Sequence, residues 1–230
     1  FVFAAGNDGE SEPGTQCQAM VYNSDIYAVS VCVVATSHYS SSSYYSANGA
    51  LASFSDKCGK VAAYCIAAPG DYLWSHTKTG SGHAWKSGTS MAAPMVSGGL
   101  AIIMQEFSSL TPAQVVSRLL STATDSGEYS QTSIYGHGMM NLNAATTAVA
   151  ELQTINGSNL LDDPNTSYYD LVDNSFTSSA AFSNALNSAL NGQVMEVYDS
   201  FDRANFKVDV GSFFTSGSYT SQNTTENHMA

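Results

Sequence analysis

Short apolar runs separated by turn residues characterise the first third of the chain. Val2–Ala5, Ala28–Ala35 and Ala62–Gly70 are apolar at most successive positions, and the last run ends at a Pro-Gly pair. Strands covered on both faces, as in a parallel sheet between two layers of helices, have this pattern. The runs therefore predict a largely parallel sheet, and Leu51–Asp56 is predicted to be a further short strand.

A long helix is predicted to begin at Ser90. Apolar residues recur there at spacings that place them on one helical face: Val96, Leu100, Ile103 and Phe107. The other faces consist largely of Gly and Ala, so we expect the helix to be buried nearly all round. Its apolar stretch, Met91–Met104, is interrupted by Pro94 and Ser97 and is too short to span a bilayer.

Two more helices and a change of composition follow. Thr111 and Pro112 form a favourable helix start, as the N-cap and the first helical residue. A last helix of the same domain is predicted over Asn141–Leu152, and the chain becomes polar and rich in turn residues near Gln153. We expect a domain over residues 1–153, a linker over 154–178, a helix and β-hairpin over 179–214, and a disordered tail over 215–230.

The composition limits the classes of partner. The chain has 230 residues, 43% of them hydrophobic, which is enough for one sizeable core and an appendage. Its 7 basic and 19 acidic residues give a formal net charge of −12, and no basic cluster occurs, so nucleic acid and anionic membranes are poor partners. The chain opens with Phe1 within an apolar run, and we expect it to be part of a longer protein.

Four cysteines are present, and their spacings match neither a C-x-x-C pair nor a zinc site, so no metal site is expected. Cys58 and Cys65 could close a short loop, and Cys17 could pair with Cys32, but the sequence does not choose among the possible connectivities. Two disulfides, each worth about 2–4 kcal/mol, would place the protein outside the reducing cytosol. Four buried free thiols are the alternative.

The segment around Ser90 has the features of a nucleophile site. Gly88 allows a substrate backbone to approach closely, and the free N–H groups at a helix start favour negative charge. A serine there can attack a carbonyl while its own N–H stabilises the oxyanion that forms. Asn7 follows the first apolar run between Gly6 and Gly9, and its neutral side-chain amide offers a second donor.

These segments resemble the motifs of the subtilisin-like serine proteases. AAGN looks like the oxyanion motif of that family and SGTSMAAPMVSG like its nucleophile motif, while SFSD…AAPG and YGHGMMNLNAA match its pattern over roughly residues 1–152. The resemblance implies a three-layer α/β fold with a mostly parallel sheet, N-terminally truncated, plus a small C-terminal helix and β-hairpin extension. It implies that Ser90 is the nucleophile, that Asn7 is the oxyanion-hole side chain, and that Gly6, Gly88 and Thr89 bind the substrate beside GSGHAWKSG.

The rest of the triad does not occur in the expected order. The family order is Asp, His, Ser, so both partners are expected upstream of Phe1, and the chain alone is expected to be inactive. Asp125 and His137 imitate the family's Asp and His motifs, but both follow Ser90. In subtilisins, removal of the histidine alone lowers kcat by about 10⁶. The missing base is therefore expected to account for most of the loss of activity.

The C-terminal eighty residues carry a second resemblance. A helix followed by VYDSFDRANFKVDVGS is similar to the segment that connects the passenger of bacterial subtilisin-like autotransporters to an outer-membrane β-barrel, and CGKVAAYC resembles a paired-cysteine loop of those enzymes. This implies an extracellular or cell-surface location, protein or peptide substrates and a covalently linked barrel downstream. The chemistry requires no cofactor; the family often binds structural calcium, but no ligand set can be named here.

Two alternatives come from other classes. A surface-displayed binding or structural passenger could keep this fold without catalysis, although the intact Asn7, Gly88 and Ser90 argue against it. An esterase would use a G-x-S-x-G turn, and the segment Gly88–Ala92 lacks the final glycine.

Overall fold

The computed structural model describes residues 1–22, 24–37, 49–78, 82–150, 152–154 and 188–210. The chain forms two compact units, Phe1–Val149 and Ala150–Ala230. The division lies a few residues before Gln153, where the composition changes.

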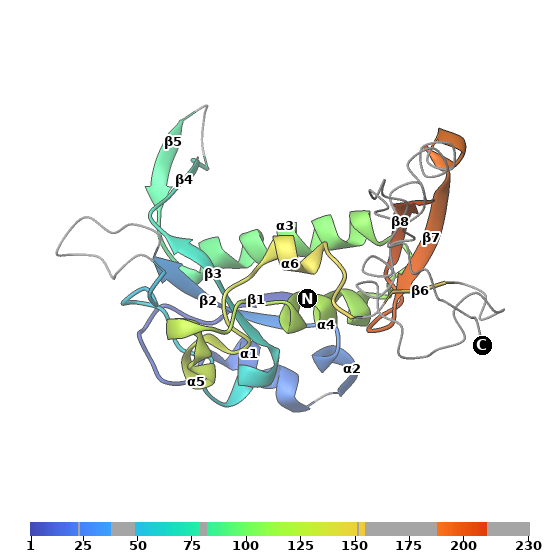
Figure 1. Ribbon diagram of the computed structural model, residues 1–230. Coiled ribbons are helices and arrows are strands. Elements are labelled where there is room, and N and C mark those ends of the chain that lie inside the picture. The colour runs from blue at the N-terminus through green and yellow to red at the C-terminus, as the bar shows by residue number, and fades with distance from the viewer. Residues whose placement is uncertain (23, 38–48, 79–81, 151, 155–187, 211–230) are drawn as a thin grey trace, which may run out of the picture. The chain divides into compact units, whose positions relative to one another are not determined.

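A parallel sheet forms the centre of the first unit (Figure 1). Its strands are β1 (Val2–Ala4), β2 (Val31–Ser37) and β3 (Cys65–Asp71), and β2 pairs with both neighbours. All seven residues of β2 are buried, as expected for a strand covered on both faces. The predicted α/β architecture with a parallel sheet is therefore confirmed.

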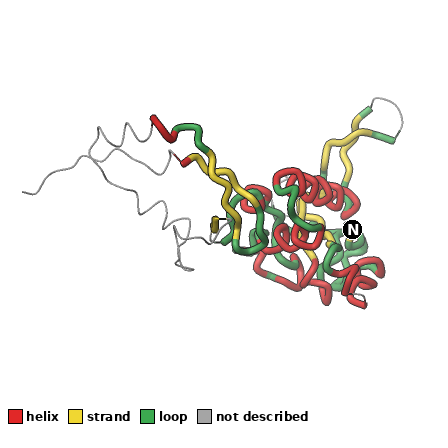
Figure 2. The backbone as a smooth tube through the Cα atoms, turned by 90° about the vertical axis from the view of Figure 1, so that its right-hand side faces the viewer, coloured by secondary structure: helices red, strands yellow, loops and turns green. Residues whose placement is uncertain are grey.

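Helices cover both faces of this sheet (Figures 1 and 2). The long helix α3 (Thr89–Glu106) packs on one face and contacts all three strands. The opposite face is covered by α1 (Thr15–Ala19), the 3₁₀ segment η2 (Gly59–Tyr64) and α5 (Thr132–Tyr135). Short helical segments complete the unit: η1 (Met20–Tyr22), α2 (Ser24–Tyr27) and η3 (Gly127–Ser130).

Two disulfides attach this second layer to the sheet. Cys17 of α1 is bonded to Cys32 of β2, and Cys58, just before η2, is bonded to Cys65 of β3. Cys32 and Cys65 are direct neighbours in the register of the two strands, so both bonds reach the same part of the sheet. The pairing that the sequence left open is thus the one between cysteines near each other along the chain.

Helix α4 (Pro112–Ser121) begins as predicted. Thr111 and Gln114 form a capping box, and Pro112 is the first helical residue. Arg118, which is completely buried, donates hydrogen bonds to the carbonyls of Ala145 and Thr147 at the end of α6 (Leu142–Ala145). A buried arginine therefore satisfies the free carbonyls of this short helix.

Three expectations about the secondary structure are wrong. Residues 51–56 do not form a strand, because a turn closes between Ser55 N–H and Ala52 O, and the Ser55 hydroxyl accepts from Ala35 N–H where a strand would offer a carbonyl. The helix predicted over Asn141–Leu152 is limited to α6. Asn141 caps its start, and the hydroxyls of Thr146 and Thr147 bond to carbonyls at its end, where they compete with further helical bonds.

The third wrong expectation is that α3 is buried nearly all round. Met95, Ile102 and Met104 are 44%, 48% and 49% exposed. The sheet covers only one side of the helix. Met95 and Ile102 lie on one flank of that side and Met104 on the other, because positions 102 and 104 are about 200° apart around a helix. None of the described helices is long and apolar enough to cross a membrane.

A hairpin that the sequence analysis did not predict follows β3. It consists of β4 (Leu73–His76) and β5 (His83–Lys86), which pair antiparallel, and it projects from the first unit (Figures 1 and 2). Its residues alternate between small, polar and aromatic types without a continuous apolar run, so the pattern of a buried strand is absent.

The second unit contains an antiparallel sheet. The predicted hairpin is confirmed as β7 (Val194–Asp199) and β8 (Asn205–Asp209), and β6 (Leu152–Thr154) adds a third strand. Of the helix predicted before it, only residues 188–190 are described, and they are helical. The predicted linker beyond Thr154 and the tail over 215–230 lie outside the described residues.

The two disulfides should stabilise the first unit unequally. The bonded cysteines are separated by 15 and 7 positions, and the longer loop restricts the unfolded chain more. Replacing Cys17 and Cys32 by Ala should lower the free energy of unfolding by about 3 kcal/mol, and replacing Cys58 and Cys65 by about 2.5 kcal/mol. Chemical denaturation tests this, and a denaturation midpoint unchanged in either double variant would contradict it.

Tyr135 should make stability fall at alkaline pH. Its hydroxyl donates to Glu128 Oε1 (2.7 Å) and accepts from Leu51 N–H (3.0 Å). Burial, together with the hydrogen bond to Glu128, raises the pKa of Tyr135 to about 12. An unfolded tyrosine loses its proton near pH 10, so this stabilisation is present below pH 10 and is lost as the pH rises through 12.

Denaturation of the wild type and of Tyr135→Phe at several pH values measures this effect. The variant should be the less stable at pH 8, because Leu51 N–H loses its acceptor. The difference in unfolding free energy should shrink between pH 10 and 12. A difference that stays constant over this range would show that the folded state does not raise the pKa of Tyr135.

Candidate active site

The first turn of α3 meets the chain just after β1 at the carboxyl edge of the parallel sheet. Thr89 N–H donates to Asn7 Oδ1 at 2.8 Å, and the Thr89 hydroxyl lies 3.0 Å from the same oxygen. Gly88 precedes Thr89 with a φ of 150°, which glycine adopts readily, and its N–H donates to Gly70 O at 2.8 Å. Asn7 therefore caps α3 from outside the helix.

This contact fixes the orientation of the Asn7 amide. A backbone N–H can only donate, so the side-chain oxygen of Asn7 must face Thr89. The Asn7 side chain is exposed, and within the described residues its Nδ2 group makes no hydrogen bond. A neutral donor is thus held in one orientation and left available to an acceptor.

Ser90 is exposed beside this donor. The first four N–H groups of a helix lack helical acceptors. Three of them are satisfied in other ways: Gly88 N–H by Gly70 O, Thr89 N–H by Asn7 Oδ1, and Met91 N–H by Gly88 O. The N–H of Ser90 has no acceptor among the described residues. Since the positive end of the helix dipole lies here, the position in front of Ser90 favours a negatively charged oxygen.

Thr89 has a different position from the one expected. It was predicted to bind substrate, but it is completely buried. Its hydroxyl accepts from Gly6 N–H at 3.2 Å and lies 3.3 Å from Gly6 O. The side chain therefore holds the segment after β1 against α3. Gly88 is also buried, Gly6 is partly exposed, and only Asn7 and Ser90 of the predicted site residues are exposed.

A buried carboxylate holds the same segment from its other side. Asp56 is 3% exposed, and its Oδ1 accepts from Asp8 N–H at 3.0 Å and from Glu10 N–H at 2.9 Å. The N–H of Asp56 donates to Gly6 O at 3.0 Å. A β-carbon on Gly6 would lie 1.9 Å from Asp56 Oδ2, and the φ of Gly6 is 127°, so only glycine fits there.

The role of Asp56 has no signal in the sequence. The pattern of residues 51–56 predicts a strand, and nothing in it indicates that a carboxylate there binds backbone N–H groups more than forty positions earlier. Such a contact depends on tertiary structure and leaves no periodic pattern in the sequence.

A catalytic base is absent from the described part of the chain. No histidine or carboxylate of the described residues hydrogen-bonds to the Ser90 hydroxyl. His137 belongs to the disulfide-bonded layer, because its N–H donates to Cys65 O and its Nε2 lies 3.0 Å from Ala63 O. Asp125 is exposed in the loop between Thr124 and η3. The described residues also form no group of three or more His, Cys, Asp or Glu that could hold a metal ion.

Comparisons with known proteins place these residues in context. A profile described as the subtilase family matches residues 1–138. Serotype-specific antigen 1 of Mannheimia haemolytica is 33% identical over 151 residues, which cover 63% of this chain and 15% of that protein. An extracellular serine protease of Serratia marcescens is 35% identical over 112 residues, which cover 40% of this chain and 11% of that protein.

A third relative is the Neisserial autotransporter lipoprotein NalP of Neisseria meningitidis serogroup B (strain ATCC BAA-335 / MC58). It is 27% identical over 155 residues, which cover 65% of this chain and 14% of that protein. The chain thus spans 15% or less of the length of each of these three relatives.

Removal of the Asp56 carboxylate should loosen the segment that carries Asn7. In Asp56→Ala, the N–H groups of Asp8 and Glu10 lose their acceptor, and each lost bond costs about 1–2 kcal/mol. Hydrogen exchange at these two amides should accelerate about tenfold or more. Asp56→Asn keeps one acceptor oxygen and should restore part of the protection. Ser53→Ala, an exposed change nearby, is the control, and equal exchange in Asp56→Ala and this control would contradict the role assigned to Asp56.

Proposed function

The chain belongs to the subtilase family, and on this premise we propose that it carries the nucleophile and the oxyanion hole of a secreted serine endopeptidase. The observation that carries the proposal is the hydrogen bond from Thr89 N–H to Asn7 Oδ1. Within the described residues, this bond leaves the Nδ2 group of Asn7 without an acceptor, and the N–H of Ser90 has none either. Two donors therefore lie next to an exposed serine hydroxyl.

The proposed reaction is the hydrolysis of a peptide bond through an acyl-enzyme. The Ser90 hydroxyl attacks the peptide carbonyl, and the oxyanion that forms accepts hydrogen bonds from Ser90 N–H and Asn7 Nδ2. The leaving amine departs with a proton, and water then releases the acyl group from Ser90. Gly88 has no side chain to obstruct the bound peptide, and Gly6 and Thr89 keep Asn7 in place.

The base that removes the Ser90 proton comes from the rest of the protein in this proposal. A histidine oriented by an aspartate supplies it, in the family order Asp, His, Ser. We propose that residues 1–230 alone are inactive, because this family order places both partners before the nucleophile. Among the described residues, no histidine or carboxylate bonds to the Ser90 hydroxyl. The proposed reaction uses no cofactor, and we assign no calcium ligand to the described residues.

The same proposal places the protein outside the cell or on its surface. Two disulfides support an oxidising compartment, and the relatives include an extracellular serine protease and an autotransporter lipoprotein. We propose that the substrates are proteins or peptides. The second unit would connect the protease to an outer-membrane β-barrel downstream.

A catalytically inactive binding or structural passenger is the alternative. It would keep the fold but would have no use for two free donors beside Ser90. A fluorophosphonate probe applied to the full-length protein separates the two possibilities, because it reacts only with an activated serine. An adduct on Ser90 supports the protease, and its absence supports the passenger.

Asn7→Asp in the full-length protein tests the oxyanion hole. Aspartate keeps an oxygen that accepts from Thr89 N–H, so the cap of α3 survives. It replaces the Nδ2 donor by a second oxygen, which repels the oxyanion. We expect kcat to fall by about 10²–10³, the loss measured for such an asparagine in a subtilisin, with KM nearly unchanged.

Asp8→Ala is the matched control for this variant. The Asp8 side chain is exposed in the same segment, whereas only its backbone N–H is bound to Asp56. Its kcat should equal that of the wild type. Full activity of Asn7→Asp would rule out Asn7 as an oxyanion donor and leave the nucleophile to be tested separately with the probe.

A further inference from the structure

One face of the β4–β5 hairpin is lined with aromatic rings. Trp74 pairs directly with Trp85 across the two strands, and His76 pairs with His83. Side chains alternate between the faces of a strand, so these four residues and Tyr72, two positions before Trp74, share one face. We call Tyr72, Trp74, His76, His83 and Trp85 the aromatic face.

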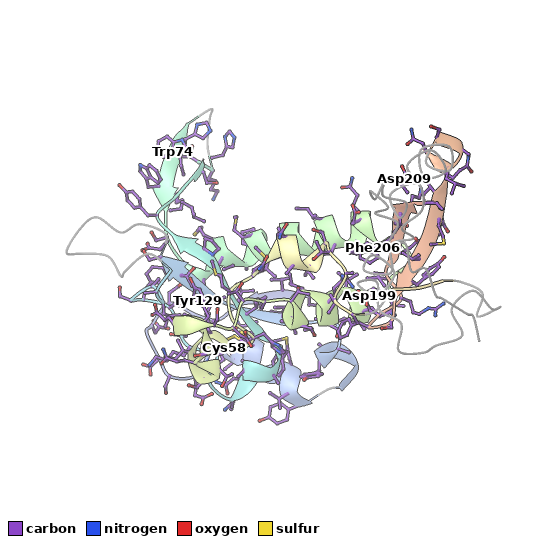
Figure 3. All side chains as sticks on the ribbon, viewed as in Figure 1. Cys58, Trp74, Tyr129, Asp199, Phe206 and Asp209 are labelled. Carbon is purple, nitrogen blue, oxygen red and sulfur yellow. A yellow bond between two sulfur atoms is a disulfide. The ribbon has the colours of Figure 1, made fainter. Side chains whose placement is uncertain are left out.

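The rings of this face stack on one another and still remain open to solvent. The ring centroids of Tyr72 and Trp85 lie 4.4 Å apart with nearly parallel planes, and those of Trp74 and His83 lie 5.8 Å apart. Trp74 is nevertheless 58% exposed and Trp85 49% exposed. Mutual stacking stabilises the hairpin, but it does not cover the outer sides of the rings. Figure 3 shows Trp74 on the part of the hairpin that projects from the first unit.

The base of the hairpin is fixed to the candidate active site. Strand β5 ends at Lys86, and Ser90 follows four positions later. Tyr72 has a φ of 55°, which is unfavourable for a residue other than glycine, and its N–H donates to the Ser87 hydroxyl at 3.0 Å. This strained junction sets the direction in which the aromatic face leaves the site.

The charge of the hairpin differs from that of the whole chain. From Tyr72 to Lys86 the sequence contains Lys78 and Lys86 and no Asp or Glu, although the formal net charge of the chain is −12. The hairpin is therefore complementary to a partner that has carboxylates next to flat apolar groups.

We propose that the aromatic face is an exosite for an extended segment of the protein substrate, one that carries aromatic or proline rings flanked by carboxylates. This inference rests on the proposed protease function. Rings of the substrate stack on the open sides of Trp74 and Trp85. The exposed Lys78, two positions after His76, attracts the carboxylates, whereas Lys86 pairs with Leu73 on the opposite face of the hairpin. The described residues near the turn, Thr77 and Lys78, are polar, so the rings lie along the flank of the hairpin, which suits a peptide better than insertion into a membrane.

The test compares a long and a short substrate with the full-length protein. The long probe is a fluorescent synthetic peptide with alternating Glu, Tyr and Pro residues, and a second version has Ser in place of Tyr and Pro. The short probe is a chromogenic tetrapeptide amide that reaches only the residues next to Ser90. Binding of the long peptides is measured by fluorescence anisotropy in a Ser90→Ala background, and hydrolysis of the tetrapeptide in the active protein.

We expect the affinity for the long peptide to fall, while hydrolysis of the short tetrapeptide does not change. The double change Trp74→Ser and His76→Ser should weaken binding of the Tyr- and Pro-containing peptide about tenfold. It should leave kcat/KM for the tetrapeptide unchanged. The Ser-substituted peptide should bind weakly to every variant. Ser75→Ala, on the opposite face of β4, is the control and should bind like the parent protein.

Several outcomes would overturn the inference. In the first, the double variant binds the Tyr- and Pro-containing peptide as tightly as its parent. In the second, Ser75→Ala loses as much affinity for this peptide as the double variant does. In the third, the protein binds heparin or phosphatidylglycerol vesicles but not the peptide. Failure of the proposed function is separate: the tetrapeptide would not be cleaved and a fluorophosphonate would not label Ser90. The peptide would then still report binding to the aromatic face.

Discussion

The hydrogen bond between Thr89 N–H and Asn7 Oδ1 joins two parts of the chain that the sequence separates by 82 positions. It satisfies the first N–H group of α3 and fixes the direction of the Asn7 amide with one contact. An N-cap supplied by the neighbouring residue would do only the first of these. Because the cap comes from the end of β1, the exposed serine and the free amide donor are positioned by the same bond. The candidate chemistry depends on this contact.

The rest of the first unit keeps the two ends of that bond in place. The strand register of the parallel sheet fixes the position of β1 relative to β3. The disulfide-bonded layer holds β2 and β3 from one face. On the other face α3 approaches very closely. A β-carbon on Gly70 would lie 2.7 Å from the Cβ of Ala35 and 2.9 Å from Gly88 O, so the start of α3 cannot accept a side chain there. Asp56 then fixes the segment after β1 by binding its backbone N–H groups.

Patterns of neighbouring residues predicted the helices and strands that neighbouring residues are enough to determine. Continuous apolar runs gave β1, β2 and β3, and the Thr111-Pro112 start gave α4 with its capping box. The same patterns failed where a side chain competes with the backbone. Ser55 ends the expected strand by accepting from Ala35 N–H, and Thr146 and Thr147 bond to the last carbonyls of α6. The burial of α3 was overestimated because the sequence of a helix does not show which of its faces has a neighbour.

The site shows the same division. Motifs alone lead to the proposal of Ser90 and Asn7 as site residues. The buried position of Thr89 and the contacts of Asp56 depend on segments that are distant in the sequence.

The most direct measurement is a crystal structure of the full-length protein with a peptide boronic acid, which imitates the tetrahedral intermediate. The account predicts boron bonded to Ser90 Oγ, and one boronate oxygen about 2.7–3.1 Å from both Ser90 N–H and Asn7 Nδ2. A boronate oxygen held by other donors, or an Asn7 amide turned away from Thr89, would contradict it.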